Sequence, residues 1–386
     1  MISVDEALQH VLALATPLPA TSVPLRHASG RILADPIVAG RDQPPFRASV
    51  MDGYAVAGDA NSYRVVGEVP AGGAMLDPIA TGDAVRIFTG APLPDGATRV
   101  IIQEDIVRTG DTITVAKDAD TAAYIREIGQ DFKTGDRIEA PQRLTPALLA
   151  LAASMNAPNV TVRKRPVVAI IATGDELVMP GEPPDPSQII ASNSFALAAI
   201  VEAEGGEARL LPIARDTQES LEAAFAMTHG ADLVVTIGGA SVGDYDLVGQ
   251  VAAHLGLERA FYKIAMRPGK PLMAGRLGTT PMLGLPGNPV SSIVCSHIFV
   301  RPLLRAMQGL PKAALPLEQG VLAKPVGPNG PRQHYMRAHL LDGALTVAER
   351  QDSSLLTVLA GANALVVRPP HDSAISSGAT VSFIKF

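Results

Sequence analysis

The sequence has a single cysteine and no excess of basic residues. Cys295 is the one thiol among 386 residues, so no disulfide can form within the chain, and the spacing of cysteine and histidine does not suit a structural zinc site. Lys and Arg number 32 against 38 Asp and Glu, which gives a formal net charge of −6. Nucleic-acid binding depends on clustered positive charge. The composition therefore argues against a nucleic-acid partner and fits a reducing compartment.

We also expect neither a membrane-spanning nor a targeting segment. Residues 1–6 contain no basic region followed by an apolar stretch, which a signal peptide would have. No apolar run approaches the roughly 18–20 residues needed to span a bilayer. We therefore expect a cytoplasmic protein with no membrane partner. Hydrophobic residues make up 47% of the chain and charged residues 18%, which is enough apolar surface for several globular domains.

Glycine and proline are plentiful. The 35 glycines and 32 prolines are scattered rather than repeated, which is typical of a chain with many turns and much β-structure. Between residues 41 and 134, short apolar runs separated by Gly, Pro and Asp predict a small, mostly β domain. The runs lie at 63–69, 84–89, 99–103 and 112–116. By composition alone, Asp52-Gly53 in this region reads as a hairpin turn.

Two helices are predicted from their first residues. Ser3 and Glu6 form a capping box at the start of an amphipathic helix. Thr145 and Pro146 begin a second helix that extends through Met155, because proline is tolerated in the first turn.

From about Lys164 to Gly309, strands and helices alternate. The continuous apolar run at 166–172 is typical of a strand buried on both faces. The alternation predicts a parallel sheet with right-handed crossovers. Its other strands are expected at 209–213, 233–237 and 281–285, its helices at 194–204 and 217–228, and a long helix from Pro289 that bends at Pro302. After Gly309 a turn-rich β-pattern returns and ends in a strand at 379–386.

Three loops follow strands of this sheet, at the edge where open α/β sheets bind ligands. The first is Thr173-Gly174-Asp175-Glu176-Leu177. Thr-Gly-Asp also occurs at positions 81, 109 and 134, where it reads as a plain turn, but only this copy follows a buried strand and adds Glu176. Glu176 is therefore a functional candidate, and a solvated turn is the alternative.

The second loop, residues 238–246, has the sequence Gly-Gly-Ala-Ser-Val-Gly-Asp-Tyr-Asp. Its glycines permit close approach of a ligand, and successive N–H groups can cradle an anion. Asp244 and Asp246 beside such a nest would repel a phosphate unless a hard cation lay between, and Mg²⁺ fits that role. The alternative is a glycine-rich turn in which Asp244 caps the next helix.

The third loop is Leu285-Pro286-Gly287-Asn288-Pro289-Val290-Ser291. Asn288 suits a helix N-cap and Pro289 the first helical position, and the free N–H groups behind them form an anion site. Between the second and third loops, the segment 263–271 carries Lys263, Arg267 and Lys270. That segment reads either as an oxyanion clamp or as a solvated charged turn.

Asp216 is an ambiguous candidate, because with Glu219 it forms an N-capping box that explains its carboxylate structurally. Taken together, the acidic groups, glycine nests and cations indicate phosphoryl, nucleotidyl or related anion chemistry with Mg²⁺. They do not name a substrate.

Seven segments in chain order resemble those of the molybdopterin molybdenumtransferases, the family that inserts molybdate into adenylylated molybdopterin and that is related to the C-terminal domain of gephyrin. They are Ser49-Val50-Met51-Asp52-Gly53-Tyr54-Ala55, Thr89-Gly90-Ala91-Pro92, Gly129-Gln130-Asp131, Thr173 to Leu177, Gly238 to Asp246, Arg267-Pro268-Gly269-Lys270-Pro271, and Leu285 to Ser291. The resemblance implies a multidomain α/β and β protein. We place an N-terminal helix and linker domain at 1–40 with 135–163, a mostly β domain at 41–134, a parallel-sheet α/β molybdopterin-binding domain at 164–308, and a C-terminal β-barrel-like domain at 309–386.

The resemblance also implies roles for individual residues. The implied catalytic residues are Asp52, Thr89, Asp131, Glu176, Asp216 and Asp246, with Mg²⁺ on Asp246 and Glu176. The implied substrate contacts are Gly238, Gly239, Ser241, Lys263, Arg267, Lys270, Pro286, Asn288, Pro289, Arg337, Ser353 and Ser354. The substrates are adenylylated molybdopterin and molybdate, and AMP is released as the molybdenum cofactor forms.

The expected assembly is an elongated homodimer, in which the α/β domain of one subunit and the β domain of the other form one cleft. An upstream adenylyltransferase and target molybdoenzymes are further partners that the resemblance suggests. Two readings from other classes stay open: a non-catalytic pterin-binding scaffold on the same fold, and an unrelated Mg²⁺-dependent nucleotidyltransferase.

Overall fold

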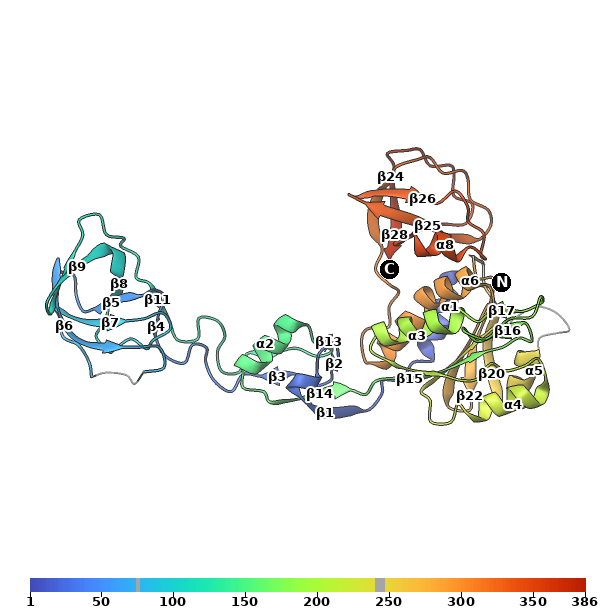
Figure 1. Ribbon diagram of the computed structural model, residues 1–386, viewed down its shortest axis with the longest axis horizontal. Helices are drawn as coiled ribbons and strands as arrows, with labels where there is room; N and C mark the ends of the chain where they lie inside the picture. Colours follow the sequence, from blue (N-terminus) through green and yellow to red (C-terminus); the bar gives the residue numbers. More distant parts are fainter. Residues whose placement is uncertain (74–76, 240–246) are drawn as a thin grey trace.

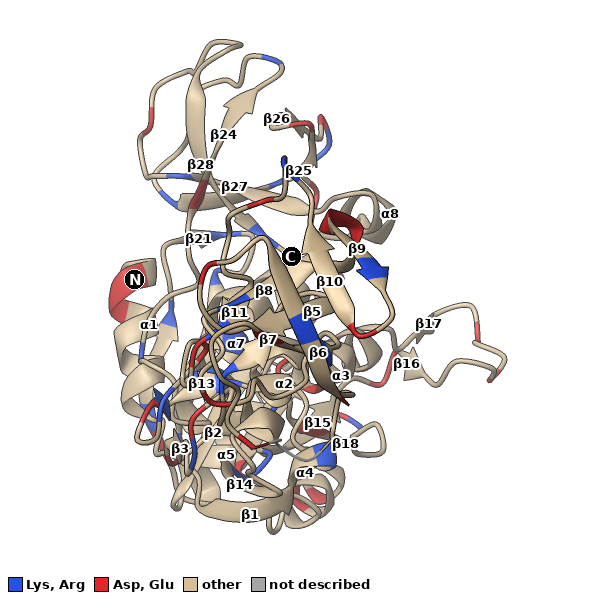
Figure 2. Cartoon of the chain, turned by 90° about the vertical axis from the view of Figure 1, so that its left-hand side faces the viewer, with Lys and Arg blue, Asp and Glu red and all other residues tan. Residues whose placement is uncertain are grey.

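A computed structural model of the protein describes residues 1–73, 77–239 and 247–386. The chain is drawn out along one axis, with a β domain at one end, a small linker domain in the middle, and an α/β domain and a barrel together at the other end (Figure 1). Seen along its long axis, the molecule has acidic and basic residues interspersed over it (Figure 2).

The linker domain is built on a four-stranded sheet in the order β1-β14-β2-β13. Its helix α2 begins as predicted, with the Thr145 hydroxyl accepting from the Leu148 N–H and Pro146 in the first turn. A second, two-stranded sheet joins β3 to β12. The elements are β1 (Ala20–Pro24), β2 (Ile32–Leu33), β3 (Ile37–Val38), β12 (Arg137–Ile138), β13 (Gln142–Arg143), α2 (Pro146–Ser154) and β14 (Asn159–Arg163).

The β domain contains a six-stranded sheet in the order β8-β5-β7-β6-β10-β9 and a small pair, β4 with β11. All four strands predicted here are confirmed, with ends shifted by one or two residues. Gly53 is the first residue of β5, which pairs with β7 and β8, so Asp52-Gly53 is not the hairpin turn that composition suggests. A Cβ atom on Gly53 would overlap the Ile101 carbonyl oxygen on the neighbouring strand β8. The elements are β4 (Ala48–Ser49), β5 (Gly53–Val56), β6 (Ser62–Val69), β7 (Asp83–Ile87), β8 (Arg99–Ile102), β9 (Ile106–Thr109), β10 (Thr112–Val115) and β11 (Ile125–Arg126).

The α/β domain has a six-stranded sheet in the order β18-β15-β19-β23-β22-β20. The first four strands are parallel, as predicted, whereas β22 and β20 extend the sheet in antiparallel fashion. The elements are β15 (Val167–Ala172), α3 (Asn193–Ala203), β18 (Glu207–Leu210), α4 (Gln218–Ala226), β19 (Leu233–Ile237), α5 (Leu247–His254), β20 (Leu257–Lys263), β22 (Pro271–Leu277) and β23 (Thr280–Leu285).

The first helix, α1 (Val4–Ala13), starts at the predicted cap, where the Ser3 hydroxyl accepts from the Glu6 N–H. Its apolar face is buried in the core of the α/β domain, against strands β20 and β22 and helix α7 (Arg301–Met307). This packing differs from our assignment of residues 1–40 to the linker domain. The apolar periodicity of a helix predicts that one face is buried, but it does not identify the sheet or domain against which that face packs.

The long helix predicted from Pro289 consists of α6 (Pro289–Cys295), a π-helical segment (Ser296–Val300) and α7 (Arg301–Met307). The irregular segment lies just before Pro302, which has no N–H to donate back along the helix. By length and composition this helix could cross a membrane, contrary to our reading of apolar runs, but 83% of its most apolar stretch is buried in the protein. A helix buried to this extent is a core helix of the protein.

The C-terminal domain is a closed barrel. Its strands follow the order β25-β26-β24-β28-β27, and β27 pairs again with β25. The short strand β21 (Met266–Arg267) leaves the α/β domain and pairs with β25, which ties the predicted cation segment to the barrel. The elements are β24 (Glu318–Leu322), β25 (Gln333–Leu341), β26 (Ala344–Val347), α8 (Leu356–Ala360), β27 (Ala364–Arg368) and β28 (Thr380–Lys385).

Candidate active site

A cavity of about 680 Å³ lies at the carboxyl ends of β15, β19 and β23. The three loops that the sequence singles out converge here, because parallel neighbouring strands end at the same sheet edge. Of the predicted site residues, the cavity is lined by Glu176, Asp216, Gly238, Gly239, Pro286, Asn288, Pro289 and Ser354.

The acidic side of the cavity is formed by Glu176 and Asp216. The capping explanation for Asp216 is wrong: Thr217 is the N-cap of α4, and its hydroxyl accepts from the Ser220 N–H. The Asp216 N–H instead donates to the Asp175 carboxylate at 3.1 Å. Burial raises the pKa of Asp216 above its ordinary value, and the nearby charges of Asp175 and Glu176 raise it further. Crowded carboxylates of this kind are stabilised by a cation.

The glycine wall of the cavity leaves no room for side chains. Gly238 has φ +98° and Gly239 has φ +64°, and a Cβ atom on Gly238 would lie 2.6 Å from the Thr173 carbonyl oxygen. Three candidates of the same loop, Ser241, Asp244 and Asp246, lie outside the described residues. Among the residues that are described, no group of three or more His, Cys, Asp or Glu could hold a metal ion. The Mg²⁺ site on Glu176 and Asp246 therefore stays a prediction.

The third wall is the start of α6. Asn288 occupies the N-cap position, but its side chain makes no capping hydrogen bond within the described part of the chain. The Asn193 amide of α3 donates to the Gly287 carbonyl at 2.7 Å and holds the loop in place. The Val290 N–H donates to the Ser353 carbonyl at 3.1 Å, so a loop of the barrel provides the cap of this helix.

A second cavity of about 330 Å³ adjoins the first and shares Pro271 and Asn288 with it. It gathers the predicted Arg267, Lys270 and Ser353 with residues that we did not predict, namely Ser291, Arg332, Gln351 and Asp352. Lys263 lines neither cavity, and its ammonium lies 5.9 Å from the centre of the Tyr262 ring.

Arg337 is only 1% exposed, which does not suit the direct oxyanion contact that we predicted. Its guanidinium donates to the carbonyls of Leu355 and Arg350 and to the Gln351 amide oxygen, each at 3.3 Å. These contacts hold the loop that carries Ser353 and Ser354. The Ser354 hydroxyl and N–H also donate to Asp352, at 2.7 and 2.8 Å.

The β domain carries the remaining candidates. Asp52 accepts from the N–H and the hydroxyl of Thr89, both at 2.8 Å, and these two hydrogen bonds hold the pKa of Asp52 below its ordinary value. Asp131 lines a separate cavity of about 350 Å³ with Gly90 and Arg126. This domain lies at the opposite end of the molecule from the 680 Å³ cavity (Figure 1). A single copy of the chain therefore does not bring the two sets together.

Comparison with known proteins identifies the family. Residues 2–156 match the MoeA N-terminal region (domain I and II), residues 169–306 a probable molybdopterin binding domain, and residues 319–386 the MoeA C-terminal region (domain IV). A molybdopterin molybdenumtransferase from Nostoc is 37% identical over 93% of this chain and 87% of its own length. The chain belongs to the molybdopterin molybdenumtransferase family. Another relative, molybdopterin molybdenumtransferase 2 of Mycobacterium tuberculosis, is 36% identical over 98% of each chain.

Solved structures agree with this family assignment. A molybdopterin biosynthesis MoeA protein from Pyrococcus horikoshii superposes with a TM-score of 0.83 at 30% identity, covering 100% of this chain and 99% of the other. The multidomain α/β and β fold is thus that of the family.

Some residues that line the larger cavity were not predicted from the sequence. Ile189, Ile190 and Asn193 line the larger cavity, and the first two belong to the short strand β17 (Ile189–Ile190), which pairs with β16 (Leu177–Val178). Asn193 could have been identified from its position in the first turn of a helix that follows a strand. Two adjacent isoleucines carry no comparable signal.

Proposed function

We propose that the protein inserts molybdenum from molybdate into adenylylated molybdopterin and releases AMP. The observation that carries the proposal is the pair of adjoining cavities, one walled by glycines and carboxylates and the other by cations. A substrate with a phosphoanhydride suits the first cavity, and a tetrahedral dianion suits the second. Their shared wall at Pro271 and Asn288 would place the two substrates side by side.

The chain's own residues perform positioning and charge neutralisation. Gly238 and Gly239 let the phosphates approach the backbone, since no side chain intervenes. Arg267 and Lys270 would hold molybdate against the Ser353 hydroxyl while two thiolate sulfurs of the pterin bond to molybdenum, and the two oxide ligands that they replace take up protons from the solvent and leave as water. A water molecule attacks the phosphoanhydride, so that AMP leaves and the pterin keeps its own phosphate. A well-placed donor in such a site contributes about 2.7–4 kcal/mol to the transition state.

Magnesium fits the acidic side of the larger cavity. The raised pKa of Asp216 reflects burial and negative charge close by, and carboxylate oxygens are the donors that Mg²⁺ prefers. Glu176 and Asp246 would hold the ion, with help from Asp216. When bound, it supplies positive charge to the pyrophosphate.

The β-domain residues enter the proposal through a homodimer. The β domain that carries Asp52 and Asp131 lies at the opposite end of the chain from the α/β domain (Figure 1), so a second copy would have to supply these residues. The ionised state of Asp52, favoured by the Thr89 hydrogen bonds, suits contact with a cation or with a substrate hydroxyl or amine.

The experiment mixes purified protein, adenylylated molybdopterin, Mg²⁺ and molybdate, and follows AMP and active cofactor. We expect AMP release that requires molybdate. Glu176→Gln should abolish release, whereas Glu182→Gln should not. Glu182 lies in the same loop region but does not line the cavity, and its carboxylate accepts from the Met179 N–H, which an amide oxygen can also do. Wild-type turnover by Glu176→Gln would remove that carboxylate from the mechanism. In a separate reaction that contains ATP and Mg²⁺ but no molybdate, consumption of ATP would favour a nucleotidyltransferase.

A further inference from the structure

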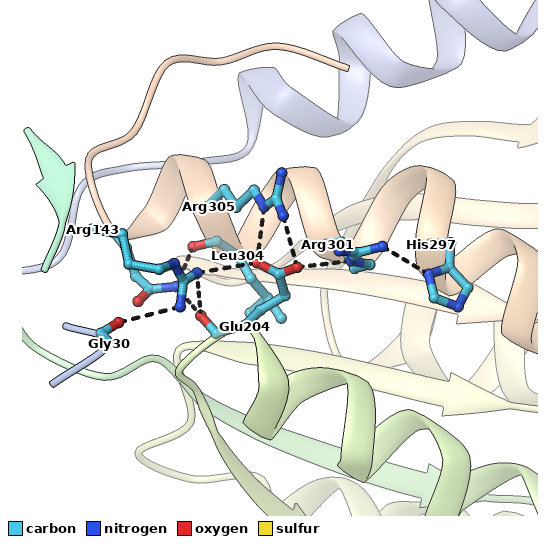
Figure 3. Close-up of polar contacts among 8 residues, drawn as sticks. Gly30, Arg143, Glu204, His297, Arg301, Leu304 and Arg305 are labelled. Carbon is cyan, nitrogen blue, oxygen red and sulfur yellow. Dashed lines mark hydrogen bonds and ion pairs between the residues drawn. The ribbon is translucent and has the colours of Figure 1, made fainter. Parts of the chain in front are cut away.

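A buried carboxylate lies where the linker domain meets the α/β domain. Glu204 is the C-cap of α3, and its side chain is 4% exposed. It accepts from the Arg301 Nε at 2.7 Å and from the Arg305 Nε and Nη2 at 2.8 and 3.0 Å (Figure 3). Both arginines belong to α7. The α/β domain thus satisfies this carboxylate with its own side chains.

A third arginine reaches the same carboxylate from the other domain. Arg143 lies on β13 of the linker sheet, and its Nη2 donates to the Glu204 carboxylate at 3.3 Å and to the Glu204 carbonyl at 3.4 Å (Figure 3). Its Nη1 donates to the Gly30 carbonyl at 3.2 Å. One guanidinium therefore joins the linker domain to the end of α3.

The charge of Glu204 does not depend on this third contact. Burial alone would raise the pKa of Glu204, but hydrogen bonds from Arg305 and Arg301 bring it below its ordinary value. Arg301 also pairs with the ring of His297 at 3.1 Å. Removing Arg143 would therefore not leave Glu204 as an unpaired buried charge, which would be strongly destabilising.

Arg143 lies where its contact with Glu204 can restrict the orientation of the linker domain relative to the α/β domain. The chain passes between the two domains twice, at residues 14–19 and 164–166, and both passages join the adjacent strands β1 and β14. Two neighbouring connections define an axis about which a domain can rotate. Arg143 lies on β13, two strands beyond β14, or about 10 Å away at the usual strand spacing. A contact away from the axis opposes rotation about it.

We propose that Arg143 acts as an interdomain latch that fixes the rotation of the linker and β domains relative to the α/β domain. The latch determines the direction in which Asp52, Thr89 and Asp131 are presented. Its bearing on turnover rests on the proposed function, whereas its effect on orientation does not.

The test measures the distance between spin labels on the two ends of the full chain. Cysteines introduced by Asp59→Cys in the β domain and Glu219→Cys on α4 are at exposed positions, and the native Cys295 is fully buried. We expect a narrow distance distribution for the otherwise wild-type protein and a broad one for Arg143→Ala. Arg26→Ala is the matched control, since Arg26 is an exposed arginine of the linker domain whose Nε donates to the neighbouring His27.

The outcomes are distinguishable. Arg143→Ala with a distribution as narrow as that of Arg26→Ala would overturn the latch. Arg143→Lys should give a distance distribution of intermediate width, because a lysine can reach Glu204 but cannot also bridge to Gly30 with a planar fork. If Arg143→Ala does not fold, the Arg143→Lys distribution tests the proposal in its place. In the insertion assay kcat should fall while the KM for molybdate stays unchanged, because Arg143 is remote from the cation cavity. A changed KM with an unchanged distance distribution would also contradict the proposal.

Discussion

Replacing Gly238 by alanine tests whether the glycine wall is part of the binding site. Gly238 has φ +98°, and an added Cβ would lie 2.6 Å from the Thr173 carbonyl oxygen and 2.9 Å from its hydroxyl. Left-handed backbone costs an L-residue about 1–2 kcal/mol, and overpacking against a fixed neighbour adds about 1–3 kcal/mol. Gly230→Ala is the matched control. Gly230 has φ +75°, but a Cβ added there would meet no atom of the described residues within 4 Å, so only the backbone penalty applies.

The assay compares urea stability and affinity for AMP in the two variants. We expect Gly230→Ala to lose about 1–2 kcal/mol of stability and to bind AMP as the wild type does. In Gly238→Ala the backbone at residue 238 must shift to relieve the overlap with Thr173. This variant should therefore lose more stability and bind AMP at least about tenfold more weakly, which corresponds to about 1.4 kcal/mol. Equal affinities for the two variants would refute the reasoning that phosphate lies against this backbone.

Three further predictions concern other parts of the molecule. Burial, aided by Arg301, lowers the pKa of His297 from 6.5 to about 4, so the stability that its neutral form contributes is present above pH 6.5 and is lost as the pH falls towards 4. Between pH 7 and pH 5 the loss in the free energy of unfolding amounts to about 2 kcal/mol. Chemical denaturation of His297→Gln should therefore show a free energy of unfolding that falls by about that much less than the wild type's over this range. The same pH dependence in both proteins would contradict the prediction. A mixture of Asp131→Asn and Glu176→Gln chains, exchanged as dimers, should recover about a quarter of wild-type activity, and no recovery would contradict a site shared between copies. Arg337→Lys should weaken molybdate binding through the Ser353 loop, with greater amide exchange in that loop, and unchanged exchange would refute the positioning role.

Much of the fold follows from local patterns. The Ser3 and Thr145 caps begin helices where predicted, and the apolar run at 166–172 is the buried strand β15. Alternating strands and helices predict parallel pairing because a helical crossover returns the chain in the same direction. The antiparallel strands β20 and β22 were not predicted. β20 is mostly exposed and β22 has four consecutive buried residues, so neither shows the alternation that marks a half-buried strand.

The candidate site is only partly predictable for a different reason. Loops at strand ends converge by topology, so Glu176, Gly238 and Asn288 could be grouped from the sequence. Whether a charged side chain faces the cavity depends on side-chain packing, which sequence spacing does not encode. Arg337 is buried and holds a loop, and Lys263 lies outside both cavities. The roles assigned to these residues stay predictions.

The most direct test of the account is a crystal structure of the protein with adenylylated molybdopterin and molybdate, in which anomalous scattering locates the molybdenum. We expect the metal beside Arg267, Lys270 and Ser353, and the pyrophosphate against Gly238 and Gly239. Molybdenum or pyrophosphate bound at a surface remote from these two cavities would contradict the account.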